Sequence, residues 1–218
     1  MKNILCFGDS NTWGMDPQAL ISGRPDIRHG RDVRWPGRLQ ALLGSEYHII
    51  EEGLNGRTTV FHDPTSPGRC GIDMFPALLE SHSPLDLVII MLGTNDCKPM
   101  LSASAAVIAM GMARLVKTAQ NPMLYAPWHK PPKILIAAPV PFGTVSAPFF
   151  GGQDEIYEKS AALADAYRNV ASMSGCEFIN LAPFGETIPG EGVHLTVAAH
   201  LRIADAYAAA VREIFARQ

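Results

Sequence analysis

Five short apolar runs recur along this chain, and they constrain its fold more than any other feature. The runs are mostly continuous and do not alternate between apolar and polar residues, which is typical of strands buried on both faces of a sheet. They cover residues 4–7, 47–50, 85–92, 134–138 and 177–181. A sheet of this kind needs helices on both of its faces.

Segments with helical periodicity lie between and after these runs. In the last of them, apolar residues recur every three or four positions from Val197 to Phe215, and Thr196 is the natural N-cap. Two more helices are marked by Ile108, Met112 and Leu115, and by Ile156, Leu163, Tyr167 and Val170. Strands that alternate with helices predict an α/β protein with a parallel sheet in a three-layer α/β/α sandwich. Three long connections, 13–34, 121–132 and 139–152, do not fit this pattern, and such connections are usually functional or mobile.

Length and charge narrow the class of protein further. A chain of 218 residues is expected to form a single domain, residues 1–218. Its 18 basic and 21 acidic residues give a net charge of −3, so we expect neither nucleic acid nor an anionic membrane as a partner. The four cysteines form no close pair, which indicates reduced thiols and no zinc or redox motif. Because we find no signal peptide and no apolar stretch long enough to span a bilayer, we expect a cytoplasmic protein.

Polar residues follow the first three runs, where ligands of open α/β sheets bind. The sequence Gly-Asp-Ser-Asn at residues 8–11 follows the first run, and its glycine permits a tight turn that would expose Ser10 at the start of a helix. A serine here also often serves only as an N-cap. Glycines at 53 and 56 follow the second run, and they free backbone N–H groups to face a ligand or simply form a turn. Asn95 follows the third run, where its amide can donate to an oxyanion or form an Asx turn.

A histidine with an acid three residues before it lies just ahead of the last helix. Glu191 can accept the Nδ1–H of His194 and leave its Nε2 free to take a proton from a serine. None of the other six histidines has a comparable acid upstream in a strand-end loop. His194 is therefore the candidate general base.

Taken in order, residues 8–10, 53–56, 93–96 and the His194 loop resemble the sequence blocks of the SGNH (GDSL) hydrolase superfamily. Longer strings at 4–10 and 85–96, with shorter ones at 32–35 and 51–54, are similar to a branch of bacterial arylesterases and acetylesterases that includes an acyltransferase known for perhydrolysis. This resemblance implies a flavodoxin-like, five-stranded parallel sheet, no metal or organic cofactor, and a homo-oligomer, with an octamer as one form. It implies a small-molecule ester substrate and water or an alcohol as the acyl acceptor.

The resemblance also implies roles for individual residues. Ser10 corresponds to the nucleophile and His194 to the base, while Ser10 N–H, Gly56 N–H and the Asn95 side chain correspond to the oxyanion hole. Two positions depart from the family pattern. Asn11 stands where the family name records leucine, a change we place outside the chemistry, and Glu191 stands where the family has aspartate. The extra methylene of Glu191 has to be absorbed by the loop if the imidazole is to reach Ser10.

Aromatic and apolar residues near these blocks are candidates for the walls of a small acyl pocket. We expect Trp13, Phe142 and Val193 to bind substrate and to favour acetyl and other short acyl groups. Phe149 and Phe150 are further candidates, although a subunit contact explains them better.

Two other functions remain open from sequence alone. A flavodoxin-like fold also suits a nucleotide-binding or flavin-binding module, but no glycine-rich phosphate loop follows any of the apolar runs. A weakly active relative is the other alternative, because Glu191 departs from the family's acid.

Overall fold

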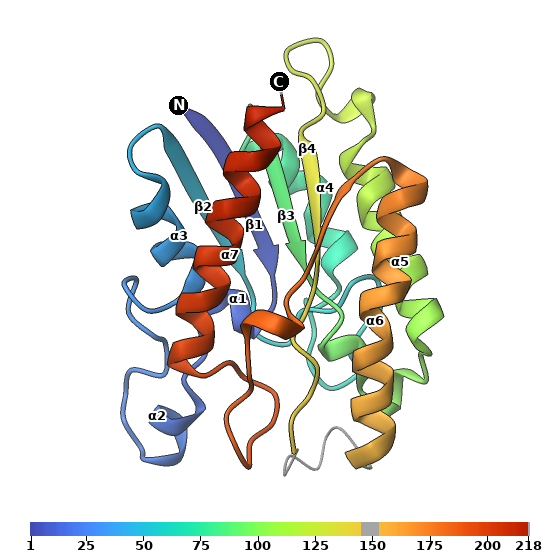
Figure 1. Cartoon of the computed structure of the whole chain (residues 1–218). Coiled ribbons are helices and arrows are strands. Elements are labelled where there is room, and N and C mark those ends of the chain that lie inside the picture. The colour runs from blue at the N-terminus through green and yellow to red at the C-terminus, as the bar shows by residue number, and fades with distance from the viewer. Residues whose placement is uncertain (145–152, 218) are drawn as a thin grey trace.

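The five apolar runs form one parallel sheet in the computed structural model, which describes residues 1–144 and 153–217 (Figure 1). The strand order is β2-β1-β3-β4-β5. Each predicted run contributes one strand, with small differences at the ends: β1 (Lys2–Gly8), β2 (Tyr47–Gly53), β3 (Leu87–Met91), β4 (Lys133–Ala138) and β5 (Glu177–Asn180). The predicted fold class is therefore confirmed.

Seven α-helices connect or follow these strands in the described part of the chain: α1 (Ser10–Trp13), α2 (Pro17–Ile21), α3 (Trp35–Leu43), α4 (Gly71–Ser81), α5 (Ala105–Ala119), α6 (Gln153–Ser174) and α7 (Val197–Ala216). The helices predicted from periodicity are α5, α6 and α7, and α1 is the helix predicted to start at Ser10. The Thr196 Oγ1 accepts the N–H of Ala199 at 3.0 Å, as expected of an N-cap. The periodicity did not predict α3 or α4. Proline and glycine near the start of α3, and Pro76 within α4, obscure the helical pattern there.

Two apolar cores lie on opposite faces of the sheet. Alternate residues of β1 show the division, because Ile4 and Cys6 belong to one core and Leu5 and Phe7 to the other. The first core is completed by α3 and α7, whose fully buried Trp35 and Tyr207 rings lie 4.5 Å apart. The second core is completed by side chains of α4, α5 and α6, among them Phe75, Met112 and Tyr167. The sheet is thus the middle layer of three.

The register brings the carboxyl ends of the first three strands together. Gly8, the last residue of β1, pairs with Gly53 at the end of β2 and with Met91 at the end of β3. The loops that follow these strands consequently start side by side, near α1 in Figure 1. The polar segments after the first three runs therefore lie at one edge of the sheet.

The long connection before α3 is attached to this edge by charge. Glu51 of β2 pairs with Arg34 at 2.5 Å and has Arg28 and Arg31 each at 3.5 Å. The Arg34–Glu51 pair joins two of the sequence strings that support the family resemblance, residues 32–35 and 51–54. The connection also contains the short helix α2, which the sequence analysis did not predict.

Two smaller expectations concern thiols and membranes. All four cysteines are free, as predicted, with Cys6, Cys70 and Cys97 buried and Cys176 half-buried. None of the described helices has the length and apolar character that crossing a membrane requires.

Candidate active site

Ser10 is the first residue of α1, directly after β1. The turn requires glycine at position 8, because a Cβ there would lie 2.0 Å from Thr12 Oγ1 and 2.9 Å from the Met91 carbonyl oxygen. Asp9 then caps the helix by accepting the N–H of Asn11 at 2.9 Å. Ser10 itself is buried, and not exposed as the sequence analysis expected, because the loop that carries His194 covers it.

A hydrogen-bond chain joins Ser10 to two residues near the other end of the sequence. The Ser10 Oγ lies 3.0 Å from His194 Nε2, and His194 Nδ1 lies 2.8 Å from Glu191 Oε1. An imidazole placed between a hydroxyl and a carboxylate can accept the hydroxyl proton while the carboxylate stabilises the resulting imidazolium. The contacts therefore match the order that nucleophilic catalysis by serine requires.

Both carboxylate oxygens of Glu191 are used. While Oε1 meets the imidazole, Oε2 accepts the backbone N–H of Val193 at 2.9 Å and that of His194 at 2.7 Å. Gly192 has a φ of 78°, a left-handed conformation that glycine adopts without strain, and it turns the chain back toward the carboxylate. The extra methylene of glutamate is accommodated by this turn. Burial opposes ionisation, but the hydrogen bonds from His194 and from the two backbone groups together lower the pKa of Glu191 below its ordinary value of 4.5.

Asn11 holds the histidine loop in place, a role that the sequence analysis missed. Its Nδ2 donates to the Val193 carbonyl at 3.2 Å, and its Oδ1 accepts the N–H of Leu195 at 3.0 Å. These two bonds flank His194 and connect its loop to the helix that starts with Ser10. An amide side chain one residue after the candidate nucleophile was the available signal, because amides bind backbone in both directions.

Asn95 reaches the same edge of the sheet from the loop after β3. Its Nδ2 donates one hydrogen to the Arg57 carbonyl at 3.1 Å, which leaves a second N–H on the same nitrogen. The neighbouring Asp96 accepts the N–H of Thr59 at 2.9 Å and also its hydroxyl. Burial outweighs these bonds and raises the pKa of Asp96 to about 6. The loop that carries Asn95 is thereby joined to the loop after β2.

Arg57 connects the loop after β2 to the end of β1. Its Nη1 donates to the Gly8 carbonyl at 2.9 Å and to the Glu52 carbonyl, and its guanidinium lies 4.3 Å from the centre of the Phe7 ring. Burial lowers the pKa of Arg57 to about 10, although Glu52 and Asp9 favour its charged form. Sequence reasoning did not identify this arginine, because its contacts with β1, to the Gly8 carbonyl and the Phe7 ring, join segments about 50 positions apart in the chain.

A cavity of about 400 Å³ opens beside Ser10. It brings together five of the predicted site residues: Ser10, Gly56, Asn95, Glu191 and His194. Val193 also lines the cavity, as expected for a substrate contact. Further lining residues, none of which the sequence analysis named, are Met15, Asn55, Thr65, Ser66 and Lys98.

Two of the three expected substrate contacts, Trp13 and Phe142, lie away from the cavity beside Ser10. Trp13 does not line the cavity, and its ring instead lies 4.9 Å from the Arg28 guanidinium. Phe142 is 3% exposed and packs in the core that α4, α5 and α6 complete. Aromatic character predicts that a side chain packs against others, but it does not show whether that side chain lines a cavity or lies elsewhere. Phe149 and Phe150 lie outside the described residues.

One wall of the cavity is a loop anchored by an ion pair. Lys98 Nζ lies 2.7 Å from Asp63 Oδ2, and the other carboxylate oxygen of Asp63 accepts the N–H and hydroxyl of Thr65. Burial opposes ionisation, but these bonds lower the pKa of Asp63 to about 2. Asp63 is therefore ionised at neutral pH, and its hydrogen bonds hold Thr65 in the cavity wall.

Comparison with known proteins identifies close relatives over nearly the whole chain. A model of the GDSL-like Lipase/Acylhydrolase family matches residues 6–202. A carbohydrate acetylesterase from Sinorhizobium meliloti has 38% identical residues and a TM-score of 0.91 over 98% of this chain and 100% of that one. The aryl esterase of M. smegmatis has 37% identity and a TM-score of 0.88, over 98% of this chain and 99% of that one. A curated acetylxylan esterase from Xylanibacter ruminicola is 25% identical over 96% of this chain, which spans 43% of the length of that relative.

The lowered pKa of Glu191 predicts a pH-dependent contribution to stability. Above pH 4.5 the folded and unfolded chains both carry the ionised group, and its hydrogen bonds stabilise the fold. This contribution is lost as the pH falls below 4.5 through the folded-state pKa. Glu191→Gln should therefore lower the free energy of unfolding by about 1.5–3 kcal/mol at neutral pH, and the deficit should shrink toward pH 3.

Urea unfolding between about pH 3 and pH 7 measures this difference. The matched control is Glu46→Gln, which changes an exposed carboxylate and should leave the stability profile unaltered. A deficit of equal size at every pH would contradict the assignment of these hydrogen bonds to the ionised carboxylate.

Proposed function

The chain belongs to the GDSL-like Lipase/Acylhydrolase family, which confirms the resemblance inferred from its sequence blocks, and from this premise we propose that it is a serine esterase for short-chain, acetyl-type carboxylic esters. The observation that carries the proposal is the 3.0 Å contact between the Ser10 hydroxyl and the His194 imidazole. The two residues are 184 positions apart in sequence, so the contact is a product of the whole fold.

In the proposed reaction, the Ser10 Oγ attacks the acyl carbonyl carbon while His194 Nε2 accepts the hydroxyl proton. Glu191, held ionised by its hydrogen bonds, stabilises the imidazolium that forms. The imidazolium then protonates the leaving alcohol, and the acyl group remains on Ser10. Water attacks this acyl-enzyme by the same steps in reverse, with His194 as the base.

We assign the oxyanion hole to Ser10 N–H, Gly56 N–H and the Asn95 side chain. All three residues line the cavity beside the Ser10 hydroxyl. The Asn95 amide is fixed by its bond to the Arg57 carbonyl, and Arg57 is itself fixed to the end of β1. Donors that are already in place cost no reorganisation when the oxyanion develops, which is why such donors contribute strongly to catalysis.

The contacts of Glu191 argue against a weakly active relative. The doubt raised by its extra methylene was that the imidazole would be held off Ser10. With a 2.8 Å bond to Nδ1 and two further bonds to backbone N–H groups, the glutamate holds both the ring and the backbone of His194. We therefore propose that Glu191 serves as the acid of a Ser-His-Glu triad.

The preference for short acyl groups is supported by the named activities of the relatives. Carbohydrate acetylesterase, aryl esterase and acetylxylan esterase are the activities those proteins carry. A cavity of about 400 Å³ with Met15 and Val193 in its walls accommodates a small acyl group. Because Ser10 is buried, we also propose that an alcohol competes with water for the acyl-enzyme, as in acyltransferases.

The nucleotide-binding alternative loses support. The hydrogen-bonded side chains of Ser10, His194 and Glu191 occupy the edge of the sheet where a flavin or nucleotide would bind. A cytoplasmic location and a homo-oligomeric state stay predictions.

Loss of the Ser10 hydroxyl tests the mechanism. Ser10→Ala removes the attacking atom, so turnover of 4-nitrophenyl acetate should fall by about 10⁵–10⁶-fold. Ser45→Ala, at an exposed serine outside the cavity, is the matched control and should match the parent rate. Substantial activity in purified Ser10→Ala would exclude Ser10 as the nucleophile.

Asn11 should act by positioning His194. Asn11→Leu removes both bonds to the histidine loop and leaves buried backbone groups unpaired, so kcat should fall by about 10- to 100-fold while KM changes little. The matched control is Asn121→Leu, which removes the cap of a short 3₁₀ helix at an exposed position and should lower only the melting temperature. An unchanged kcat in Asn11→Leu would show that the loop holds His194 without it.

A panel of acyl chain lengths tests the substrate class. The kcat/KM for 4-nitrophenyl esters should decrease from acetyl to butyryl to octanoyl, in line with the acetylesterase activities that two of the relatives carry. Octanoyl esters hydrolysed faster than acetyl esters would overturn the short-chain proposal. Added ethanol should divert part of the acetyl group into ethyl acetate, and acetate as the sole product at every ethanol concentration would exclude transfer.

A further inference from the structure

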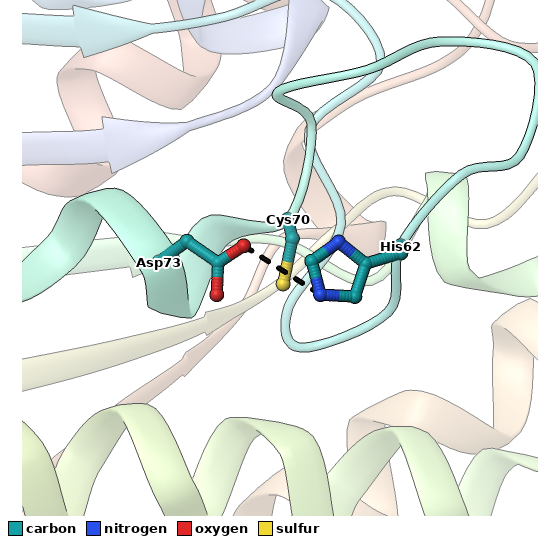
Figure 2. A group of neighbouring side chains, drawn as sticks. All are labelled: His62, Cys70 and Asp73. Atoms are coloured by element: carbon teal, nitrogen blue, oxygen red, sulfur yellow. Dashed lines mark ion pairs between the residues drawn. The ribbon is translucent and has the colours of Figure 1, made fainter.

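Three side chains with different metal-ligating atoms lie together outside the active-site cavity. The His62 imidazole, the Cys70 sulfur and the Asp73 carboxylate each offer one ligand atom, and these atoms all lie within 4.8 Å of one another. His62 Nε2 and Asp73 Oδ2 are 3.6 Å apart. Figure 2 shows the Cys70 sulfur between the imidazole ring and the carboxylate. None of the three residues lines the cavity beside Ser10.

The combination of donors selects for a class of metal. Thiolate, imidazole and carboxylate together suit Zn²⁺, which binds all three, whereas Mg²⁺ and Ca²⁺ prefer oxygen ligands alone. Three protein ligands leave one tetrahedral position for water. In a tetrahedral site with bonds of about 2.0–2.3 Å, neighbouring ligand atoms lie roughly 3.3–3.7 Å apart. The pair of His62 and Asp73 is already at this separation.

One ligand is fixed and the other two can adjust to it. Cys70 is 2% exposed and precedes α4, and its backbone pairs with Thr58 through a β-bridge. The side chains of His62 and Asp73 are 79% and 54% exposed, so they can move by the small amount that coordination needs. A cation can therefore bind the buried thiol together with the two exposed side chains beside it.

We propose that His62, Cys70 and Asp73 form a Zn²⁺ site that clamps the loop between residues 62 and 70. This loop contains Thr65 and Ser66, which form part of the cavity wall. The Asp63–Lys98 ion pair anchors the loop near its start, and coordination would tie residue 62 to residues 70 and 73. The site is distinct from the catalytic residues, and the proposal does not depend on the esterase activity.

The sequence alone gave no reason to expect this site. Cys70 has no neighbouring cysteine, and the spacing of the three residues matches no zinc motif. The loop between 62 and 70 brings His62 back to the start of α4, where Asp73 lies in the first turn.

Metal binding is tested directly with tag-free, metal-free protein. Zn²⁺ titrated by calorimetry should bind one ion per chain, and Co²⁺ should produce a thiolate-to-metal absorption band in the near ultraviolet. His62→Ala, Cys70→Ser and Asp73→Asn should each weaken Zn²⁺ binding by more than about tenfold, the lower end of what even outer-shell changes cause. Matched controls are His129→Ala and Cys176→Ser, which should bind Zn²⁺ as the parent does.

Other outcomes would overturn the site. The His194 and Glu191 pair can also attract Zn²⁺, so binding lost in His194→Ala but kept in His62→Ala would place the ion in the catalytic centre. The absence of a thiolate band with Co²⁺ would exclude Cys70 as a ligand. His62→Ala changes an exposed residue and therefore keeps the test valid if Cys70→Ser fails to fold.

The effect on the loop is measured by hydrogen exchange. Zn²⁺ should slow exchange of backbone amides in residues 62–70 of the parent and not of His62→Ala. Exchange that is unchanged by Zn²⁺ in the parent would overturn the clamp. Because neither readout uses ester turnover, failure of this proposal is distinguishable from failure of the proposed esterase function.

Discussion

The contact between the Ser10 hydroxyl and the His194 imidazole is the interaction that constrains this fold most, since it joins residues 184 positions apart at 3.0 Å. Three supports meet this constraint. The first is the glycine turn after β1, and the second is α7, whose N-cap Thr196 follows His194 by two residues. The third is the packing of α7 on α3 through Tyr207 and Trp35. The position of the imidazole therefore depends on the core that α3 and α7 complete.

Buried polar groups then remove the remaining freedom at this edge of the sheet. Arg57 joins the loop after β2 to β1, Asp96 joins the loop after β3 to Thr59, and Asn11 joins α1 to the histidine loop. Each bond links segments that are far apart in the chain. Groups buried in this way are costly when they are unpaired, so the hydrogen bonds that they do form stabilise the fold and also fix the geometry of the site. Stability and preorganisation thus come from the same contacts.

The sequence predicted those parts of the molecule that depend on local patterns. The five strands follow from continuous apolar runs, and α7 follows from its periodicity and its N-cap. Helices α3 and α4 were missed because proline and glycine interrupt their pattern. Ser10 and Asn95 were selected because they follow strand ends, and His194 because an acid precedes it by three residues. Trp13 and Phe142 could not be placed, since an aromatic ring fits a pocket wall and a core equally well, and only the packing of distant elements decides between them.

Glu191 shows how a departure from a family motif can be absorbed by the backbone. A longer acid would push the imidazole away if the loop kept the shape that suits aspartate. Here the left-handed Gly192 turns the chain so that the second carboxylate oxygen binds two backbone N–H groups. The extra methylene lets Oε2 of Glu191 bind the backbone of the histidine loop, while Oε1 still contacts His194 Nδ1. The side chain and the turn are consequently one unit, and the acid at this position has to be judged together with the glycine that follows it.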